Sequence, residues 1–154
     1  MKKKIKPQVK FFKNQFFFHK DKRRTISGLA GNLKFNQNFK QMKIIKVTNK
    51  SIKKTVIGNH RHKYNSNQWE FIYVLHESSS KPIFEFRYKN YENSVKKKNL
   101  FSGDCVIVPP GCALGLLPLV TGGIIIEMSN KIYHNNYEKI ELFENLKSKL
   151  ILST

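Results

Sequence analysis

The first part of the sequence has almost no negative charge. Residues 1–63 hold 16 Lys and 3 Arg but one acid, Asp21, whereas residues 64–154 hold 10 basic and 9 acidic residues. Nearly all of the net charge of +19 is therefore N-terminal. This asymmetry indicates an anionic partner, such as a phosphate group, nucleic acid or a membrane surface. Because Asn and Ile are also abundant, an AT-rich coding sequence explains part of the Lys excess.

Several other features are scarce or absent. The two cysteines, Cys105 and Cys112, lie too far apart for a zinc ribbon or a redox motif, so we expect two small buried side chains; a cross-turn disulfide or a shared metal is the alternative. The longest apolar stretch, residues 112–126, is interrupted by Gly and Pro and does not predict a membrane span. We expect no secretory signal, because Lys13, Asn14 and Gln15 interrupt the apolar residues of the basic N-terminal segment. The sequence shows no P-loop, Rossmann fingerprint or nucleophile elbow. We expect a cytoplasmic protein.

The length of 154 residues predicts one domain. Short segments bounded by turn residues predict strands at 43–48, 54–57, 69–76, 82–88, 104–108, 113–120 and 123–128. Apolar residues then recur at intervals of three and four from Tyr137 to Leu150, which predicts an amphipathic helix at about 136–151. The expected fold is all-β, a sandwich or barrel packed by a C-terminal helix.

The basic segment 1–24 also contains five Phe residues and is expected to be distinct from the domain at 25–154. It is interpreted as an N-terminal arm or a first edge strand, which could be exchanged with a partner subunit. A membrane-surface segment with Phe anchors and a loosely ordered tail are the alternatives.

Two motifs carry the candidate chemistry, residues 58–62 (Gly-Asn-His-Arg-His) and residues 103–111, which end in Pro-Pro-Gly. Residues two apart in a strand share a side, so His60 and His62 both face the interior or both face water. Two buried imidazoles need polar partners, which favours a ligand site over packing. A solvated basic corner is the alternative. Glu70 is the nearest acid and could join the histidines around a metal.

Together the two motifs resemble the conserved strand-turn motifs of the cupin superfamily, whose fold is a jelly-roll barrel, or double-stranded β-helix. The segment 58–63 is similar to the Gly-x-His-x-His-Lys segment of the cupin nucleotide-sugar 3,4-ketoisomerases, which are related to the deoxysugar 3,5-epimerases. It is also similar to a segment in the cupin domains of capsular polysaccharide assembly enzymes. Residues 128–137 resemble the ketoisomerase ending, so the resemblance covers roughly residues 40–143.

This resemblance implies a cupin that acts on or binds a keto-deoxysugar nucleotide in surface polysaccharide synthesis. His60 and His62 would be the catalytic acid and base, with His60 as the base. Arg61 and Lys63 would contact phosphate, and Glu70 and Tyr133 would bind substrate. The resemblance also implies a homodimer without a cofactor. All of these assignments are expectations from the resemblance.

The sequence also departs from the family pattern. Leu114 stands where the last metal-binding histidine is expected, so a divalent metal held by His60, His62 and Glu70 is not favoured. Ile57 replaces the arginine that precedes the motif glycine in the ketoisomerases and epimerases. A non-catalytic cupin that binds a carbohydrate or metabolite is therefore the alternative, with an incomplete metal site as the second. An N-terminal arm that binds nucleic acid or lipid head groups is a further alternative.

Overall fold

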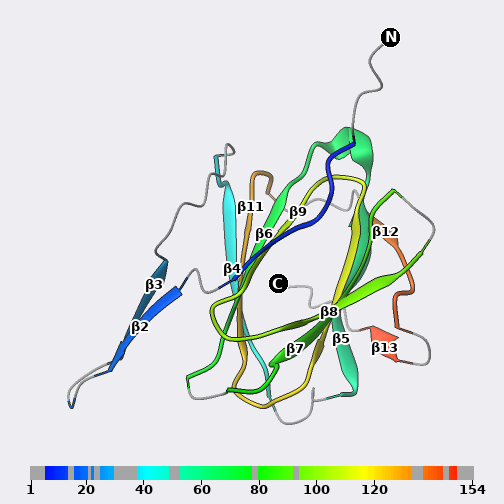
Figure 1. The fold of residues 1–154 in the computed structure, drawn as a ribbon. Coiled ribbons are helices and arrows are strands. Elements are labelled where there is room, and N and C mark those ends of the chain that lie inside the picture. The colour runs from blue at the N-terminus through cyan, green and yellow to red at the C-terminus, as the bar shows by residue number, and fades with distance from the viewer. Residues whose placement is uncertain are drawn as a thin grey trace.

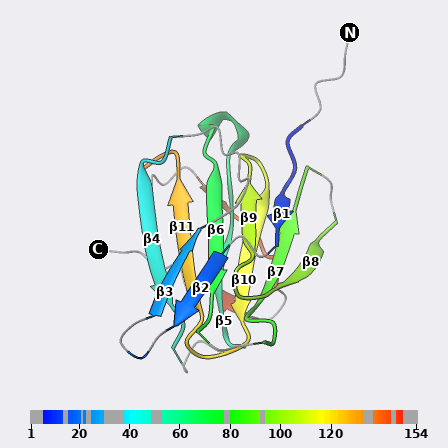
Figure 2. The same ribbon diagram turned by 60° about the vertical axis from the view of Figure 1, so that its left-hand side comes forward.

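The computed structural model describes residues 6–13, 16–20, 22, 25–29, 38–48, 53–77, 80–91, 94–132, 137–143 and 146–148. Strands form most of it, in two sheets that face each other (Figures 1 and 2). In spatial order, the first sheet contains β1 (Lys10–Phe12), β9 (Cys105–Val108), β6 (Glu70–Leu75), β11 (Ile124–Ser129) and β4 (Gln41–Lys46). The second contains β12 (Tyr137–Lys139), β5 (Thr55–His62), β10 (Ala113–Pro118), β7 (Phe84–Lys89) and β8 (Lys96–Leu100).

Four short elements complete the fold. A 3-10 turn, η2 (Tyr64–Ser66), follows β5, and β13 (Lys147–Ser148) pairs with β5 in parallel. The strands β2 (Phe16–Lys20) and β3 (Thr25–Leu29) form a separate hairpin. The described residues include no helix of the length and hydropathy needed to cross a membrane.

The core lies between the two sheets. In β4 the side chains alternate between half-buried and exposed, which is the period-2 pattern of a strand with one covered face. Every residue of β10 is buried, because the core covers one face and Leu142 and Phe143 cover the other. The all-β jelly-roll expectation is confirmed, and each of the seven predicted strands has a counterpart, from β4 to β7 and from β9 to β11.

The predicted C-terminal helix at about 136–151 is wrong in the described part of that range. Tyr137 to Lys139 form β12, which is antiparallel to the edge of β5, and Lys147 and Ser148 form β13. The spacing of Ile140, Phe143 and Leu146 arises because these side chains pack, together with Leu142, in one cluster against the outer face of the second sheet. Backbone pairing with the open edge of β5 satisfies these N–H groups without a helix.

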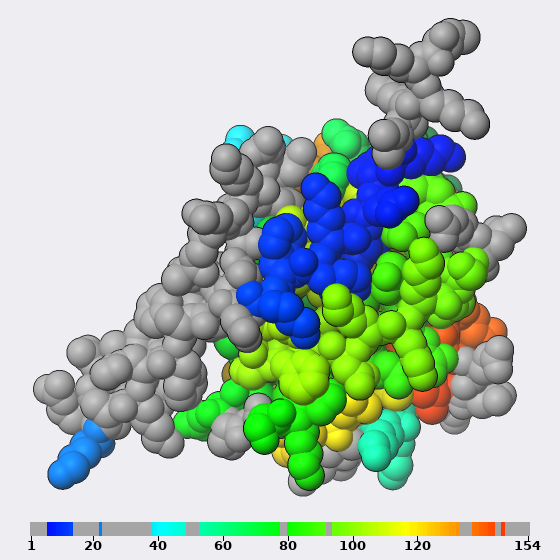
Figure 3. All heavy atoms as spheres, in the orientation of Figure 1, coloured from blue at the N-terminus to red at the C-terminus, as the bar shows by residue number. Residues whose placement is uncertain are grey.

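The N-terminal segment 6–13 lies across the surface of the barrel beside the chain around β8 (Figure 3). Its strand β1 pairs with β9 of the same chain and forms one edge of the first sheet. The Lys98 ammonium lies 4.2 Å from the ring centroid of Phe11, and Lys13 Nζ lies 2.6 Å from Asp104 Oδ2. Exchange of this segment with a partner subunit stays a prediction.

Both cysteines are buried free thiols, as predicted for small apolar side chains. Cys112 belongs to the core between the sheets, whereas Cys105 packs with Phe71 and Tyr73 in a separate cluster. Burial raises the pKa of each thiol to about 12.

Candidate functional site

A β-bulge in β5 turns His60 and His62 toward the core. Ile57 packs against the core, so strict alternation would place His60 on the opposite face. However, Gly58 pairs with Gly115 and His60 pairs with the next residue back, Leu114, which leaves Asn59 as an extra residue. The extra residue reverses the alternation, and His60 shares the inner face with buried Leu114.

The local sequence suits this bulge. Gly58 and Asn59 both have positive φ, 91° and 62°, which glycine adopts freely and asparagine tolerates. A Cβ at Gly58 would lie 2.9 Å from Leu114 Cδ1, so the position also needs the absence of a side chain. Asn59 is held by the C-terminal segment: its Oδ1 accepts a hydrogen bond from the Leu142 N–H (2.9 Å) and its carbonyl accepts one from the Ile140 N–H (3.0 Å).

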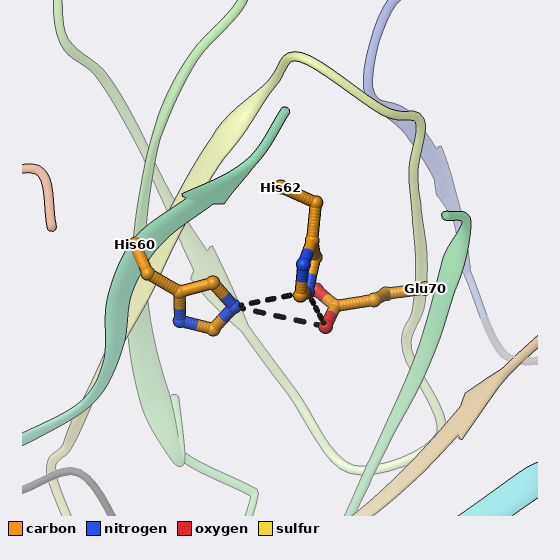
Figure 4. A group of neighbouring side chains, drawn as sticks. All are labelled: His60, His62 and Glu70. Atoms are coloured by element: carbon orange, nitrogen blue, oxygen red, sulfur yellow. Dashed lines mark hydrogen bonds and ion pairs between the residues drawn. The ribbon is translucent and has the colours of Figure 1, made fainter. Parts of the chain in front are cut away.

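Glu70, the first residue of β6, meets the two histidines from the opposite sheet. Its Cα partner on β9 is Val108, a core residue, so the Glu70 side chain also points inward. His62 Nε2 lies 2.7 Å from Glu70 Oε1, and His60 Nε2 lies 3.7 Å from the same oxygen. The two Nε2 atoms are 3.3 Å apart. Figure 4 shows the three side chains converging on one point.

The electrostatics of the cluster follow from burial and this proximity. Burial acts to lower the pKa of His60, but the Glu70 carboxylate outweighs it, assisted by the charge of Glu127, and the pKa is raised above its ordinary value. Burial alone would raise the pKa of Glu70, but the neighbouring His62 and His60 hold it well below its usual range. His62 Nδ1 and Glu70 Oε2 have no hydrogen-bond partner among the described residues. The carboxylate is therefore ionised, with basic nitrogens beside it.

The donor set of the cluster also fits a divalent metal. His60, His62 and Glu70 each offer one ligand atom, and these atoms lie within 4.8 Å of one another. Two imidazole nitrogens and one carboxylate oxygen suit zinc, iron, nickel or manganese. Leu114, which pairs with His60 on the same face, cannot be a fourth ligand. Such a site would keep an open position, which is the arrangement of catalytic rather than structural zinc sites.

The structure places the other predicted site residues elsewhere. Arg61 alternates with the histidines and pairs with Ala113, which belongs to the cluster on the outer face. Its guanidinium lies 2.9 Å from Glu138 Oε2. Lys63 is exposed just before η2, and Tyr133 lies outside the described residues. Neither Arg61 nor Lys63 joins the cluster.

Three further polar residues lie near the cluster. Lys43 and Glu127 form an ion pair on the inner face of the first sheet, and the Tyr137 ring lies against His60, with centroids 5.6 Å apart. Period-2 alternation in residues 41–46 places Lys43 on the same face as Ile45, and Glu127 interrupts an apolar run at 124–128. Each signal concerns one residue, and it is the strand register that shows that the two residues meet.

Searches of protein-family models and of curated proteins find no match for this sequence. Solved structures do match. A mutant 3,4-ketoisomerase from Thermoanaerobacterium thermosaccharolyticum, solved with TDP-4-keto-6-deoxyglucose, is 16% identical with a TM-score of 0.62, covering 85% of this chain and 86% of its own. A 3,4-ketoisomerase from Helicobacter canadensis is 15% identical with a TM-score of 0.60, covering 85% and 90%.

A third match is the dTDP-4-dehydrorhamnose 3,5-epimerase from Bacillus anthracis, solved with TDP and pyrophosphate bound. It is 14% identical with a TM-score of 0.60, covering 85% of this chain and 77% of its own. At these identities the likeness shows the fold, which is the cupin jelly roll that the two sequence motifs predicted.

Proposed function

We propose that this chain binds a keto-deoxysugar nucleotide and isomerises or epimerises its sugar by histidine acid-base chemistry. The observation that carries the proposal is the convergence of His60 and His62 on buried Glu70 inside the barrel. Packing does not explain two imidazoles and a carboxylate in contact inside a β-barrel. Burying these polar groups costs free energy, whereas apolar residues at the same positions could be buried without that cost. A ligand that uses these groups accounts for them.

In the proposed reaction, neutral His60 removes a proton from the carbon next to the ketone. The C–H bond breaks, the N–H bond forms on the imidazole, and the electron pair moves to the ketone oxygen as an enolate. The Glu70 carboxylate stabilises the imidazolium that results, in the way a buried carboxylate supports a histidine base. In isomerisation, the hydroxyl proton on the carbon that lost its hydrogen moves to the former ketone oxygen, and the imidazolium returns its proton to the former ketone carbon, so that the ketone now lies on the neighbouring carbon. In epimerisation, an acid on the opposite face delivers a proton to the carbon that lost one, and the ketone is restored.

The ligand class is supported by two further observations. Structural neighbours were solved with TDP-4-keto-6-deoxyglucose and with TDP, which shows what those proteins bind. The net charge of +19 favours a diphosphate group electrostatically. The resemblance implies that Arg61 and Lys63 contact phosphate, and this role stays a prediction.

The test is an exchange experiment in deuterated water. The protein is incubated with a TDP-linked 4-keto-6-deoxyglucose, and NMR follows deuterium at the ring carbons that flank the ketone. Deuterium incorporation that needs the protein supports the proposal. Binding of the nucleotide sugar without incorporation instead identifies the non-catalytic carbohydrate-binding cupin, and the absence of both refutes the ligand class.

A second candidate function is divalent metal binding by His60, His62 and Glu70, which the convergence of three ligand atoms favours. A metal there would polarise a ligand oxygen as a Lewis acid. Elemental analysis of protein purified without chelators tests this candidate. One equivalent of a transition metal that is lost in His60→Ala supports it, and metal-free protein that also takes up no zinc on dialysis refutes it.

A further inference from the structure

The first sheet presents charged side chains to the inside of the barrel beside the His60–His62–Glu70 cluster. Cα partners in neighbouring strands place their side chains on the same face of a sheet. One row of partners runs from β4 through β11 and β6 to β9, and it consists of Lys43, Glu127, Ile72 and Val106. The next row consists of Gln41, Ser129, Glu70 and Val108.

Both rows face inward, because Ile72, Val106 and Val108 belong to the core between the sheets. Lys43 and Glu127 therefore lie one row away from Glu70, on the same face. Adjacent rows on one face are two residues apart along each strand, or about 7 Å. Glu127 is also one strand away from Glu70 and Lys43 is two strands away. Diagonal neighbours of this kind are about 7–8 Å apart, so Glu127 is the nearer member of the pair, and a sugar ring between the cluster and the pair can reach both side chains.

The pair itself is tight and partly buried. Lys43 Nζ lies 2.9 Å from Glu127 Oε1, and the two side chains are 29% and 15% exposed. Desolvation offsets much of the attraction in a pair so placed, so its contribution to stability is a weak reason for its presence. Apolar residues at these positions would extend the core that already contains Ile72 and Val106.

Glu127 is also electrostatically part of the same site. Burial raises the pKa of Glu127, and the charge of Glu70 raises it further, whereas Lys43 acts to lower it. The charge of Glu127 acts in turn to raise the pKa of His60. Two carboxylates that interact in this way need cationic or hydrogen-bonding partners, and Lys43 is one such partner of Glu127.

The chemistry of the pair points to a particular ligand group. Lys43 offers N–H donors only, and ionised Glu127 offers acceptors only, side by side. A sugar ring with oxygen atoms on adjacent carbons matches both: one oxygen accepts a hydrogen bond from Lys43, and the neighbouring hydroxyl donates to Glu127. Charge-assisted hydrogen bonds of this kind are stronger than neutral ones.

We propose that Lys43 and Glu127 bind the sugar ring of the ligand through two oxygen atoms on adjacent carbons. The inference rests on the proposed function and assigns the sugar-recognition residues of the same site. Lys43 and Glu127 would thereby hold the ring while His60 acts on it. The nucleoside diphosphate part of the ligand would not contact Lys43 or Glu127.

The test is calorimetric titration with two probes, TDP alone and TDP-4-keto-6-deoxyglucose. Lys43→Met and Glu127→Gln are expected to weaken binding of the sugar nucleotide at least about tenfold and to leave TDP binding unchanged. The matched controls change the same residue types away from the site. Lys46→Met alters the exposed face of β4, and Glu77→Gln alters an exposed residue just after β6, at the end of that strand away from Glu70; both are expected to bind both probes as wild type does.

A charge-swapped double variant, K43E/E127K, separates binding from folding. If the ion pair is purely structural, the swap restores the thermal stability lost in the single variants and restores sugar binding with it. We expect restored stability without restored sugar binding, because donor and acceptor have exchanged places. Single variants that bind the sugar nucleotide as wild type does overturn this inference, and a swap that recovers full affinity does so too.

These outcomes are distinct from failure of the proposed function. If the wild-type protein catalyses deuterium exchange but the pair variants retain affinity, the proposed function stands and the sugar-binding role of the pair falls. If the wild-type protein neither binds the sugar nucleotide nor catalyses deuterium exchange, both fall together.

Discussion

Asn59 controls the bulge that turns the histidines inward, and its replacement by alanine should destabilise the fold. The Asn59 side-chain oxygen accepts the Leu142 N–H at 2.9 Å in a buried setting, so its removal leaves that donor unpaired at a cost of about 1–3 kcal/mol. Alanine at φ 62° adds about 1–2 kcal/mol of backbone strain. We therefore expect Asn59→Ala to lower the free energy of unfolding by about 2–5 kcal/mol.

Two matched variants separate the two contributions. Asn59→Gly keeps the backbone conformation but loses the acceptor, so its stability should lie between those of Asn59→Ala and wild type. Asn59→Asp keeps an oxygen acceptor and tolerates the same φ, so it should remain closest to wild type. Urea unfolding followed by circular dichroism measures the series, with equal m values confirming that the same cooperative unit unfolds. If Asn59→Ala and Asn59→Asp differ by less than about 0.5 kcal/mol, the hydrogen bond and the strain do not hold the bulge as argued.

Three further predictions concern the cluster and the thiols. Glu70→Gln removes the carboxylate that raises the pKa of His60 and leaves the burial that lowers it, so the neutral base becomes available at lower pH. The midpoint of the pH-rate profile for deuterium exchange should therefore move to lower pH, and an unchanged midpoint would contradict the assigned partnership. Leu114→His places a third imidazole beside His60 and should raise the affinity for zinc at least about tenfold, as measured by dialysis followed by elemental analysis. Unchanged affinity would mean that the cluster does not bind metal. Burial raises the pKa values of Cys105 and Cys112 to about 12, so both thiols should react with a thiol reagent at pH 8 only as fast as the protein unfolds. Rapid labelling of the native protein would show that the thiols are accessible.

The sequence predicted the strands best where an apolar face alternates with a polar one. It missed β8, which pairs with β7 at the end of the second sheet, because Lys96, Lys97 and Lys98 show no apolar alternation. It also gave the wrong element after Tyr137. A spacing of three and four residues occurs both in an amphipathic helix and in an extended segment whose side chains cover a neighbouring sheet. Here the backbone pairs with β5, so the segment that starts at Tyr137 is extended.

The candidate site could be predicted in part. The two-residue spacing placed His60 and His62 on one face of the strand. Whether that face is the inner or the outer one depends on the bulge at Asn59, and the bulge depends on a hydrogen bond from Leu142, 83 residues away. Glu70 was recognised as the nearest acid in sequence, and the structure brings it into contact with both histidines. Long-range pairings such as these are set by strand register, which a single sequence does not reveal.

Lys43 and Glu127 show the same limit. They lie 84 residues apart and meet because β4 and β11 are neighbours in the first sheet. Each residue alone reads as an ordinary charged position on a strand. Only the register shows that both face the core, where a charge calls for a partner or a ligand.

The central claim, proton transfer by His60 beside a ketone, is tested most directly by comparing two histidine variants in the deuterium exchange experiment. His60→Gln should slow incorporation from wild type by about 10²–10⁴-fold, which is the usual contribution of a general base. His76→Gln is the matched control, because His76 lies after β6 with its Nε2 2.9 Å from the Thr121 carbonyl, and it should exchange at the wild-type rate. Equal rates in wild type and His60→Gln would contradict the account.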